Sequence, residues 1–220
     1  MGYNIAIDGP AGAGKSTIAR RAAEELGFLY VDTGAMYRAV ALYMIQNKIP
    51  ADDQAAVAEA CRDADISLRY EGGAQQVYLN GDNVSGLIRS AEVSRNTSVI
   101  SGYPEVRAKL LGLQRETAAA HDVVMDGRDI GTSILPDAQL KIYLTASIHT
   151  RALRRCEELK EKGTDCSLPE IEKEIEERDY RDMHRQAAPL KRAEDAVLID
   201  SSDLTIEEVT QKVVGLVRGE

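Results

Sequence analysis

The feature that most constrains the fold is a glycine-rich segment near the start of the chain. Residues 9–16 read Gly-Pro-Ala-Gly-Ala-Gly-Lys-Ser and match the pattern G-x-x-x-x-G-K-[ST]. A short apolar run at residues 4–8 precedes this segment, and residues 15–26 carry apolar side chains at helical spacing before Gly27. A strand, a glycine loop and a helix in this order are typical of a loop that binds phosphate groups.

Each part of this loop has a chemical role in holding a triphosphate. Glycine at positions 9 and 14 lets the backbone turn tightly and approach a phosphate without a Cβ in the way. Lys15 would reach the β- and γ-phosphates, and the Ser16 hydroxyl would bind Mg²⁺. We therefore predict that the following residues bind MgATP: Gly9, Pro10, Ala11, Gly12, Ala13, Gly14, Lys15, Ser16 and Thr17.

Two other classes of nucleotide-binding protein are disfavoured. A dinucleotide-binding fold needs a third glycine, but residues 12–14 are followed by Lys15, Ser16 and Thr17. A guanine-nucleotide switch would usually carry Asn-Lys-x-Asp, whereas the single Asn-Lys pair, at 47–48, is followed by Ile-Pro. The loop therefore indicates a nucleoside triphosphate, and a second motif is needed to indicate the reaction.

Strand and helix patterns alternate along the chain and predict an α/β fold. Further strand patterns lie at residues 28–31, 123–126, 140–144 and 197–200, and helical patterns lie at 36–44, 104–120, 148–162, from about 169 to before Pro189, and from Thr205 onward. Such alternation favours a parallel sheet flanked by helices, the P-loop NTPase fold. A chain of 220 residues suits one domain, which we place at 1–220.

A different pattern interrupts this alternation between residues 64 and 95. Short strand patterns at 66–70, 77–79 and 82–84 follow one another closely, and Asn80-Gly81 between the last two is a strong signal for a two-residue hairpin turn. We predict a small antiparallel β insert at 64–95.

Composition and charge exclude several kinds of partner. A formal net charge of -9 opposes binding to nucleic acid, which requires clustered Lys and Arg. The longest apolar stretch, residues 39–45, is far shorter than the roughly 20 residues that span a membrane, and the first residues do not resemble a secretory signal. We expect a soluble, cytoplasmic monomer that binds small molecules and neither nucleic acid nor membranes.

The three cysteines give no sign of a metal site. Cys61, Cys156 and Cys166 are widely spaced and have no His or Cys neighbour at metal-ligand spacing. We expect all three to be reduced thiols without a function, as is usual in cytoplasmic proteins. The three histidines, His121, His149 and His184, are isolated and are expected on the surface.

Arginines near the ends of predicted elements suggest a second anion site. They are Arg38, Arg107, Arg128, Arg151, Arg155, Arg178, Arg181 and Arg185. On a helix, Arg178, Asp182 and Arg185 would share one face. A planar guanidinium group can donate two parallel hydrogen bonds to the oxygens of one phosphate. The alternative is that these arginines form surface ion pairs with Glu174, Glu177 and Asp179.

Four motifs occur in order along nearly the whole chain. They are Asp-Gly-Pro-Ala-Gly-Ala-Gly-Lys-Ser at 8–16, Asp-Thr-Gly-Ala-Met-Tyr-Arg at 32–38, Asp-Gly-Arg-Asp-Ile-Gly at 126–131, and Arg-Asp-Tyr-Arg-Asp-Met-His-Arg at 178–185 with Ala-Pro at 188–189. Together they resemble the bacterial cytidylate kinases, and the last two motifs are more specific than the phosphate loop. The segment 80–89 also resembles the end of the extra nucleotide-binding subdomain of that family.

The resemblance implies an acceptor site for CMP or dCMP. Its residues would be Thr33, Arg38, Ser98, Arg107, Arg128, Asp129, Arg178, Asp182 and Arg185. By this resemblance, Arg38, Arg128 and Arg178 hold the acceptor phosphate, Ser98, Arg107 and Asp129 read the cytosine edge, and Asp182 with Arg185 holds the sugar and orients the base pocket. The family commonly has Ser at the position of Thr33 and a small residue or Thr at that of Ser16; both replacements keep a hydroxyl.

The resemblance also implies a mobile helical lid at 150–166. Its Arg151 and Arg155 would close over the ATP phosphates and exclude water. Together with Lys15, Arg128 and Arg178, these two arginines are the expected catalytic residues. The expected reaction is transfer of the γ-phosphoryl group of MgATP to CMP or dCMP. A kinase for a small metabolite such as shikimate or gluconate, or a nucleotide-binding regulatory module, would be the alternatives.

Two aspartates follow predicted strands at the end where parallel sheets bind ligands. Asp32 and Asp126 would each either hold a water molecule on the Mg²⁺ ion bound by Ser16 or cap the next helix.

Overall fold

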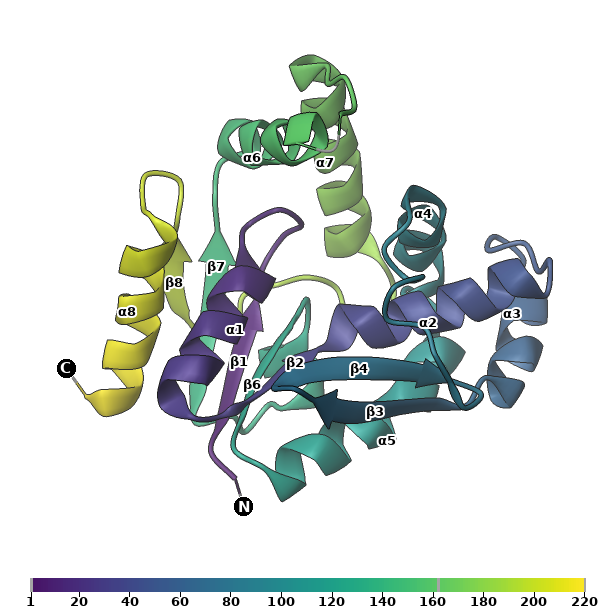
Figure 1. The fold of residues 1–220 in the computed structure, drawn as a ribbon, viewed down its shortest axis with the longest axis horizontal. Helices are drawn as coiled ribbons and strands as arrows, with labels where there is room; N and C mark the ends of the chain where they lie inside the picture. Colours follow the sequence, from purple (N-terminus) through teal and green to yellow (C-terminus); the bar gives the residue numbers. More distant parts are fainter. Residues whose placement is uncertain (1, 162, 220) are drawn as a thin grey trace.

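A sheet of five parallel strands organises the structure, a computed structural model that describes residues 2–161 and 163–219 (Figure 1). Its strands are β1 (Asn4–Asp8), β2 (Leu29–Asp32), β6 (Val123–Gly127), β7 (Leu140–Thr145) and β8 (Val197–Asp200). They lie in the order β2-β6-β1-β7-β8, and every pairing is parallel. The predicted α/β fold is therefore confirmed.

Helices cover both faces of this sheet, as the apolar strand sequences require. They are α1 (Lys15–Leu26), α2 (Thr33–Gln46), α3 (Gln54–Ala60), α4 (Ala91–Ile100), α5 (Pro104–Ala120), α6 (Ile148–Glu161), α7 (Leu168–His184) and α8 (Ile206–Arg218). Side chains of β1 alternate between two cores: Ile5 and Ile7 pack with α1 and α8, whereas Ala6 packs with α2 and α5.

Three short antiparallel strands form a second sheet beside the first. They are β3 (Ile66–Glu71), β4 (Ala74–Leu79) and β5 (Asp82–Asn83), in the order β3-β4-β5. Asn80 and Gly81 make the turn with φ of 50° and 90°, as the hairpin prediction requires. The strand β4 runs beside β2, the edge strand of the main sheet, and below α2 (Figure 1).

The carboxyl ends of the central strands meet at one edge, where the functional residues gather. Asp8, at the end of β1, lies opposite Gly127, at the end of β6. The loop between β1 and α1 leaves this edge toward α6 (Figure 1). Ligands of open parallel sheets bind at this edge, next to the helices that follow the strands.

Sequence patterns did not predict four of the elements, one of them a 3-10 turn at Cys61–Asp63. The other three are α3, α4 and a short π-helical turn at Ile130–Ile134. Both helices are short and bury few apolar side chains: α3 buries Val57 alone, and α4 buries Val93 and Ile100. The predicted strand 28–31 lies at 29–32, and the helix predicted to reach residue 162 ends at Glu161, next to a residue outside the described part.

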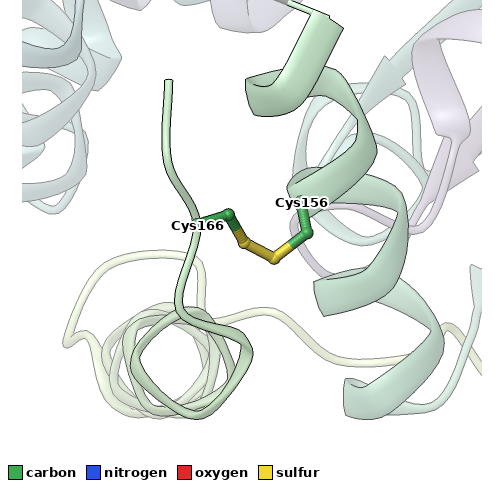
Figure 2. Close-up of a disulfide and its surroundings, with 2 residues drawn as sticks. All are labelled: Cys156 and Cys166. Atoms are coloured by element: carbon green, nitrogen blue, oxygen red, sulfur yellow. A yellow bond between two sulfur atoms is a disulfide. The ribbon is translucent and has the colours of Figure 1, made fainter. Parts of the chain in front are cut away.

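The expectation of three reduced thiols is wrong for two of them. Cys156 on α6 and Cys166, just before α7, form a disulfide with a Cα–Cα separation of 5.5 Å (Figure 2). The chain reverses direction between α6 and α7, and the spacing of ten positions carries no signal of that reversal. Cys61 is free and buried. The three histidines are exposed, as expected.

None of the helices in the described residues is both long and apolar enough to cross a lipid bilayer.

Candidate active site

A cavity of about 520 Å³ opens at the carboxyl edge of the sheet. One side is formed by the phosphate loop, from Ala11 to Thr17; Gly9 and Pro10 lie outside the lining. The other side contains all nine residues of the expected acceptor site: Thr33, Arg38, Ser98, Arg107, Arg128, Asp129, Arg178, Asp182 and Arg185. The fold thus brings these nine residues together although Thr33 and Arg185 are 152 positions apart in the chain (185 − 33).

The phosphate loop owes its shape to glycine at two positions. A Cβ at Gly9, where φ is 149°, would collide with the carbonyl oxygen of Leu144. Gly14 has φ of 85° and immediately precedes α1, so the helix begins with free N–H groups at the cavity. Lys15 Nζ donates to the Pro10 carbonyl at 2.6 Å, and burial together with the nearby Arg128 lowers the pKa of Lys15 well below its ordinary value.

Ion pairs hold the opposite wall of the cavity together. Arg128 Nε donates to Asp182 Oδ2 at 2.9 Å, and Asp129 is shared by Arg107 and by Arg185, whose Nη2 lies 3.0 Å from Asp129 Oδ1. Burial raises the pKa of Asp182, but the charges of Arg128, Arg178 and Arg185 together outweigh this effect and keep that pKa below its ordinary value. Both carboxylates are thereby held in fixed positions on the wall.

Three polar groups on the same wall lack a hydrogen-bond partner among the described residues. They are Arg38 Nε, Ser98 Oγ and Arg178 Nε, all buried. Arg178 also makes no ion pair within the described part of the chain, and burial followed by the cation Arg128 lowers its pKa to about 10. Since unpaired buried donors are costly, this wall is suited to bind an anion.

Asp32 and Asp126 have different partners. Asp32 caps α2, because its Oδ1 accepts from Ala35 N at 2.9 Å, and its Oδ2 pairs with Arg38 Nη2 at 2.7 Å. Asp126 caps no helix; it accepts from Ser16 Oγ at 2.9 Å and from the hydroxyl of Tyr30. Burial, followed by repulsion from Asp32, raises the pKa of Asp126 to about 6.

The groups next to Ser16 are of the kind that binds Mg²⁺. The Ser16 hydroxyl and the Asp126 carboxylate are hard oxygen donors, and a cation would offset the repulsion that raises the Asp126 pKa. The described residues contain no cluster of three or more His, Cys, Asp or Glu side chains that could hold a metal ion alone. A Mg²⁺ ion at this place would therefore need phosphate oxygens and water as further ligands.

The expected lid arginines do not line the cavity in this structure. Arg151 is buried against the phosphate loop, where it pairs with Asp179 at 2.7 Å and donates to the Ala11 carbonyl at 2.9 Å. Arg155 is exposed and pairs with Glu158. The lining arginine of α6 is Arg154, which donates to the Ser201 carbonyl at 2.7 Å.

Sequence reasoning missed part of the cavity. At the end near α8 the lining includes Ser201, Leu204, Thr205, Ile206 and Val209. The side that carries the nine expected acceptor residues, called the acceptor wall below, also includes Tyr37, Thr97 and Ser101. The capping-box pattern of Thr205 and Glu208 marked the start of α8, but nothing in that pattern indicated that the helix start faces a ligand site. These residues become recognisable only when the strand order places β8 beside β7.

Solved structures similar to this chain support the fold alone. An uncharacterised protein from Eubacterium ventriosum is 14% identical, with a TM-score of 0.54 and full coverage of both chains. A gluconokinase from Sinorhizobium meliloti is also 14% identical, with a TM-score of 0.50 over 98% of this chain and 92% of its own.

Sequence comparison is far more specific. The cytidylate kinase from Lactobacillus gasseri is 48% identical over 97% of this chain and 93% of its own length. The cytidylate kinase from Caldicellulosiruptor bescii is 51% identical over 97% of this chain and 94% of its own length. The sequence profile of the cytidylate kinase family matches residues 5–219. The chain therefore belongs to the cytidylate kinase family, a family of nucleoside monophosphate kinases.

Proposed function

We propose that this protein transfers the γ-phosphoryl group of ATP to CMP or dCMP, and that the acceptor binds against the arginine-rich wall of the cavity. The observation that carries this proposal is Arg178, a half-buried cation without an ion-pair partner in the described chain, beside Arg128 and facing the phosphate loop. A phosphate monoester would satisfy its free Nε donor and offset the repulsion between the two guanidinium groups.

The donor nucleotide binds along the phosphate loop. Backbone N–H groups of the loop and of the first turn of α1 would hold the β-phosphate, and Lys15 would move from the Pro10 carbonyl to the β- and γ-phosphates. The lining near α8, with Leu204, Ile206 and Arg154, offers apolar and planar surfaces suited to the base of the triphosphate.

The acceptor residues divide by chemistry. Arg38, Arg128 and Arg178 would hold the acceptor phosphate; Ser98, Arg107 and Asp129 would read the cytosine edge; Asp182 and Arg185 would hold the sugar and orient the base pocket. Asp129 is suited to accept from the cytosine amino group, because Arg107 and Arg185 fix its carboxylate. Thr33 Oγ1 donates to the Asp126 carbonyl at 2.8 Å, which leaves the hydroxyl oxygen able to accept a further bond.

The chemistry requires positioning and charge neutralisation. In an in-line transfer, the bond from the γ-phosphorus to the ADP oxygen breaks while an oxygen of the acceptor phosphate bonds to that phosphorus, giving ADP and CDP or dCDP. The arginines and Lys15 stabilise the charge that develops on the transferred group. Mg²⁺ would be held by Ser16 and would neutralise phosphate oxygens. Asp126, which accepts from Ser16, and Asp32 would be the candidates to bind its water.

Three further parts of the proposal concern the whole molecule. The insert at 64–95 acts as a nucleotide-binding subdomain within the single domain 1–220. The region 150–166 acts as a lid that brings Arg151 and Arg155 over the phosphates when both substrates are bound. The protein works as a monomer in the cytoplasm.

A coupled assay with ATP and Mg²⁺ across nucleoside monophosphates tests this function. CMP and dCMP should be phosphorylated well, and UMP should be at least about tenfold poorer in kcat/KM, because uracil lacks the amino group that Asp129 is placed to accept from. Equal rates with CMP and UMP would refute the base-reading assignment. Absence of turnover with CMP would refute the proposed function.

A further inference from the structure

The insert contacts the main sheet through a side chain that continues the sheet's hydrogen bonding. Strand β2 is an edge strand, so one side of its backbone has no neighbouring strand in the main sheet. Gln75, on β4 of the insert, fills this place at Asp32. Its Oε1 accepts from Asp32 N at 2.9 Å, and its Nε2 donates to the Asp32 carbonyl at 3.2 Å. The amide thus pairs with one residue as a strand would.

The side chain of Asp32 connects this contact to the acceptor wall. Its carboxylate is buried and binds Ala35 N through Oδ1 and Arg38 Nη2 through Oδ2. Arg38 lines the cavity, and its Nε has no other partner among the described residues. A continuous series of hydrogen bonds therefore runs from the insert, through both the backbone and the side chain of Asp32, to a guanidinium group of the acceptor site.

The outer side of the Asp32 backbone is held by the Gln75 amide. A second cavity, of about 280 Å³, opens beside the contact between the insert and β2 and is lined by both Gln75 and Asp32. Strand β2 pairs with β6 along its other edge, and Arg89 Nη2 lies 3.8 Å from Asp32 Oδ2. On the outer edge no described strand of the main sheet lies against Asp32, so the two hydrogen bonds to its backbone there come from the Gln75 side chain. A shift of the Asp32 backbone would change the direction in which its carboxylate holds Arg38.

We propose that Gln75 is a positioning residue for the phosphate of the acceptor, acting through Asp32 and Arg38. The insert then contributes to catalysis by fixing a guanidinium group of the acceptor wall, and not only by any direct contact with the nucleotide. This inference rests on the proposed function and extends it to a residue outside the main cavity.

Gln75→Ala tests the proposal, with Gln76→Ala as the matched control. Gln76 is the next residue of β4 and lines the second cavity, but its amide pairs with Asn83 and makes no bond to Asp32. We expect Gln75→Ala to raise KM for CMP about five- to tenfold, the size of effect expected for a residue that acts on a site without contacting the substrate. KM for ATP should stay within about twofold of the wild-type value. Gln76→Ala should change neither value by more than about twofold.

A second variant and two folding measurements distinguish loss of positioning from loss of folding. Gln75→Glu keeps an acceptor for Asp32 N but places a carboxylate oxygen against the Asp32 carbonyl, so it should raise KM for CMP at least as much as Gln75→Ala. Thermal unfolding and circular dichroism of both variants establish that each is folded. A general destabilisation would lower the fraction of active enzyme. It would therefore reduce the apparent kcat and leave KM for CMP and KM for ATP unchanged.

The Arg38→Ala background gives the sharpest test. If Gln75 acts through Arg38, adding Gln75→Ala to Arg38→Ala should weaken equilibrium binding of CMP by less than about twofold further. Losses that multiply in the double variant, or equal effects of Gln75→Ala and Gln76→Ala, would overturn the inference while the wild type remains active on CMP. A wild type without CMP turnover would overturn the proposed function, and the inference with it.

Discussion

The two walls of the cavity are built in opposite ways. The phosphate loop is a run of consecutive residues, and it offers mainly backbone N–H groups whose directions are fixed by positive φ at Gly9, Gly12 and Gly14. The acceptor wall is assembled from α2, α4, α5, the end of β6 and α7, and it offers side chains held by ion pairs. The first wall is set by local sequence, and the second depends on the whole fold.

This difference implies different responses to substitution. A change in the phosphate loop should affect the donor phosphates and the chemical step. A change in one carboxylate of the acceptor wall should release two cations at once, since Asp129 serves both Arg107 and Arg185. The following predictions test this contrast.

The largest effect is expected at Lys15. Lys15→Met should lower kcat by about a hundredfold or more, because the ammonium that neutralises charge on the transferred phosphoryl group is lost. Binding of CMP should stay within about threefold, since Lys15 belongs to the other wall. Steady-state kinetics and equilibrium titration of CMP measure the two effects, with Lys109→Met on the exposed side of α5 as the control. Unchanged kcat would remove the role assigned to the phosphate loop.

A smaller and more selective loss is expected at Asp129. Asp129→Ala should lower kcat/KM for CMP by about ten- to a hundredfold, because Arg107 and Arg185 lose their shared partner and the base loses its acceptor. Binding of ATP should remain within about twofold. The control is Asp137→Ala, which changes an exposed aspartate. Equal losses for both substrates would contradict the separation of the two walls.

Asp8 joins the two walls and provides a test by pH. Its carboxylate accepts from Ile130 N at 2.7 Å and from Gly131 N at 2.8 Å, which holds the segment that carries Arg128 and Asp129. Burial is the main cause that raises the pKa of Asp8 to about 6, above its ordinary value of 3.8. The folded protein therefore binds this proton more tightly than the unfolded chain does.

The stability contribution of this group should rise as the pH falls through 6. Between pH 7 and pH 5 it should add about 1 kcal/mol to the free energy of unfolding in the wild type, and Asp8→Asn should lack this increment. Urea unfolding of both proteins at the two pH values measures the difference. The same pH dependence in wild type and variant would show that Asp8 titrates normally.

The smallest effect on turnover is expected from the disulfide, because neither Cys156 nor Cys166 lines the cavity. Reduction should change kcat by less than about twofold. Thiol titration of the unfolded protein without reductant should detect one thiol, Cys61, and three after reduction. Three thiols before reduction would show that the pair is not formed in solution.

The sequence predicted the locally determined parts of the molecule well. The helix that follows the phosphate loop begins and ends where its apolar spacing and Gly27 place it, and the Asn80-Gly81 turn has the backbone angles that its residues favour. Such features depend on a few neighbouring residues and are visible in their order.

Other features could not be predicted from the sequence because they depend on contacts between residues far apart in the chain. The amide of Gln75 meets Asp32 across 43 positions, and no pattern in either segment indicates that pairing. Arg154 and Arg155 are neighbours with the same charge, yet the former lines the cavity and the latter is exposed. Which side chains of α6 reach the cavity depends on how the helix packs against α7 and the residue that follows β8, and that packing is not visible in the sequence of the helix.

The central claim is that two anions bind side by side on two separate walls. Calorimetric titration of CMP into protein saturated with Mg²⁺ and a non-hydrolysable ATP analogue tests it most directly. We expect one CMP to bind per chain, with an affinity equal to or higher than the affinity measured without the analogue. Competition, in which the analogue displaces CMP, would contradict it.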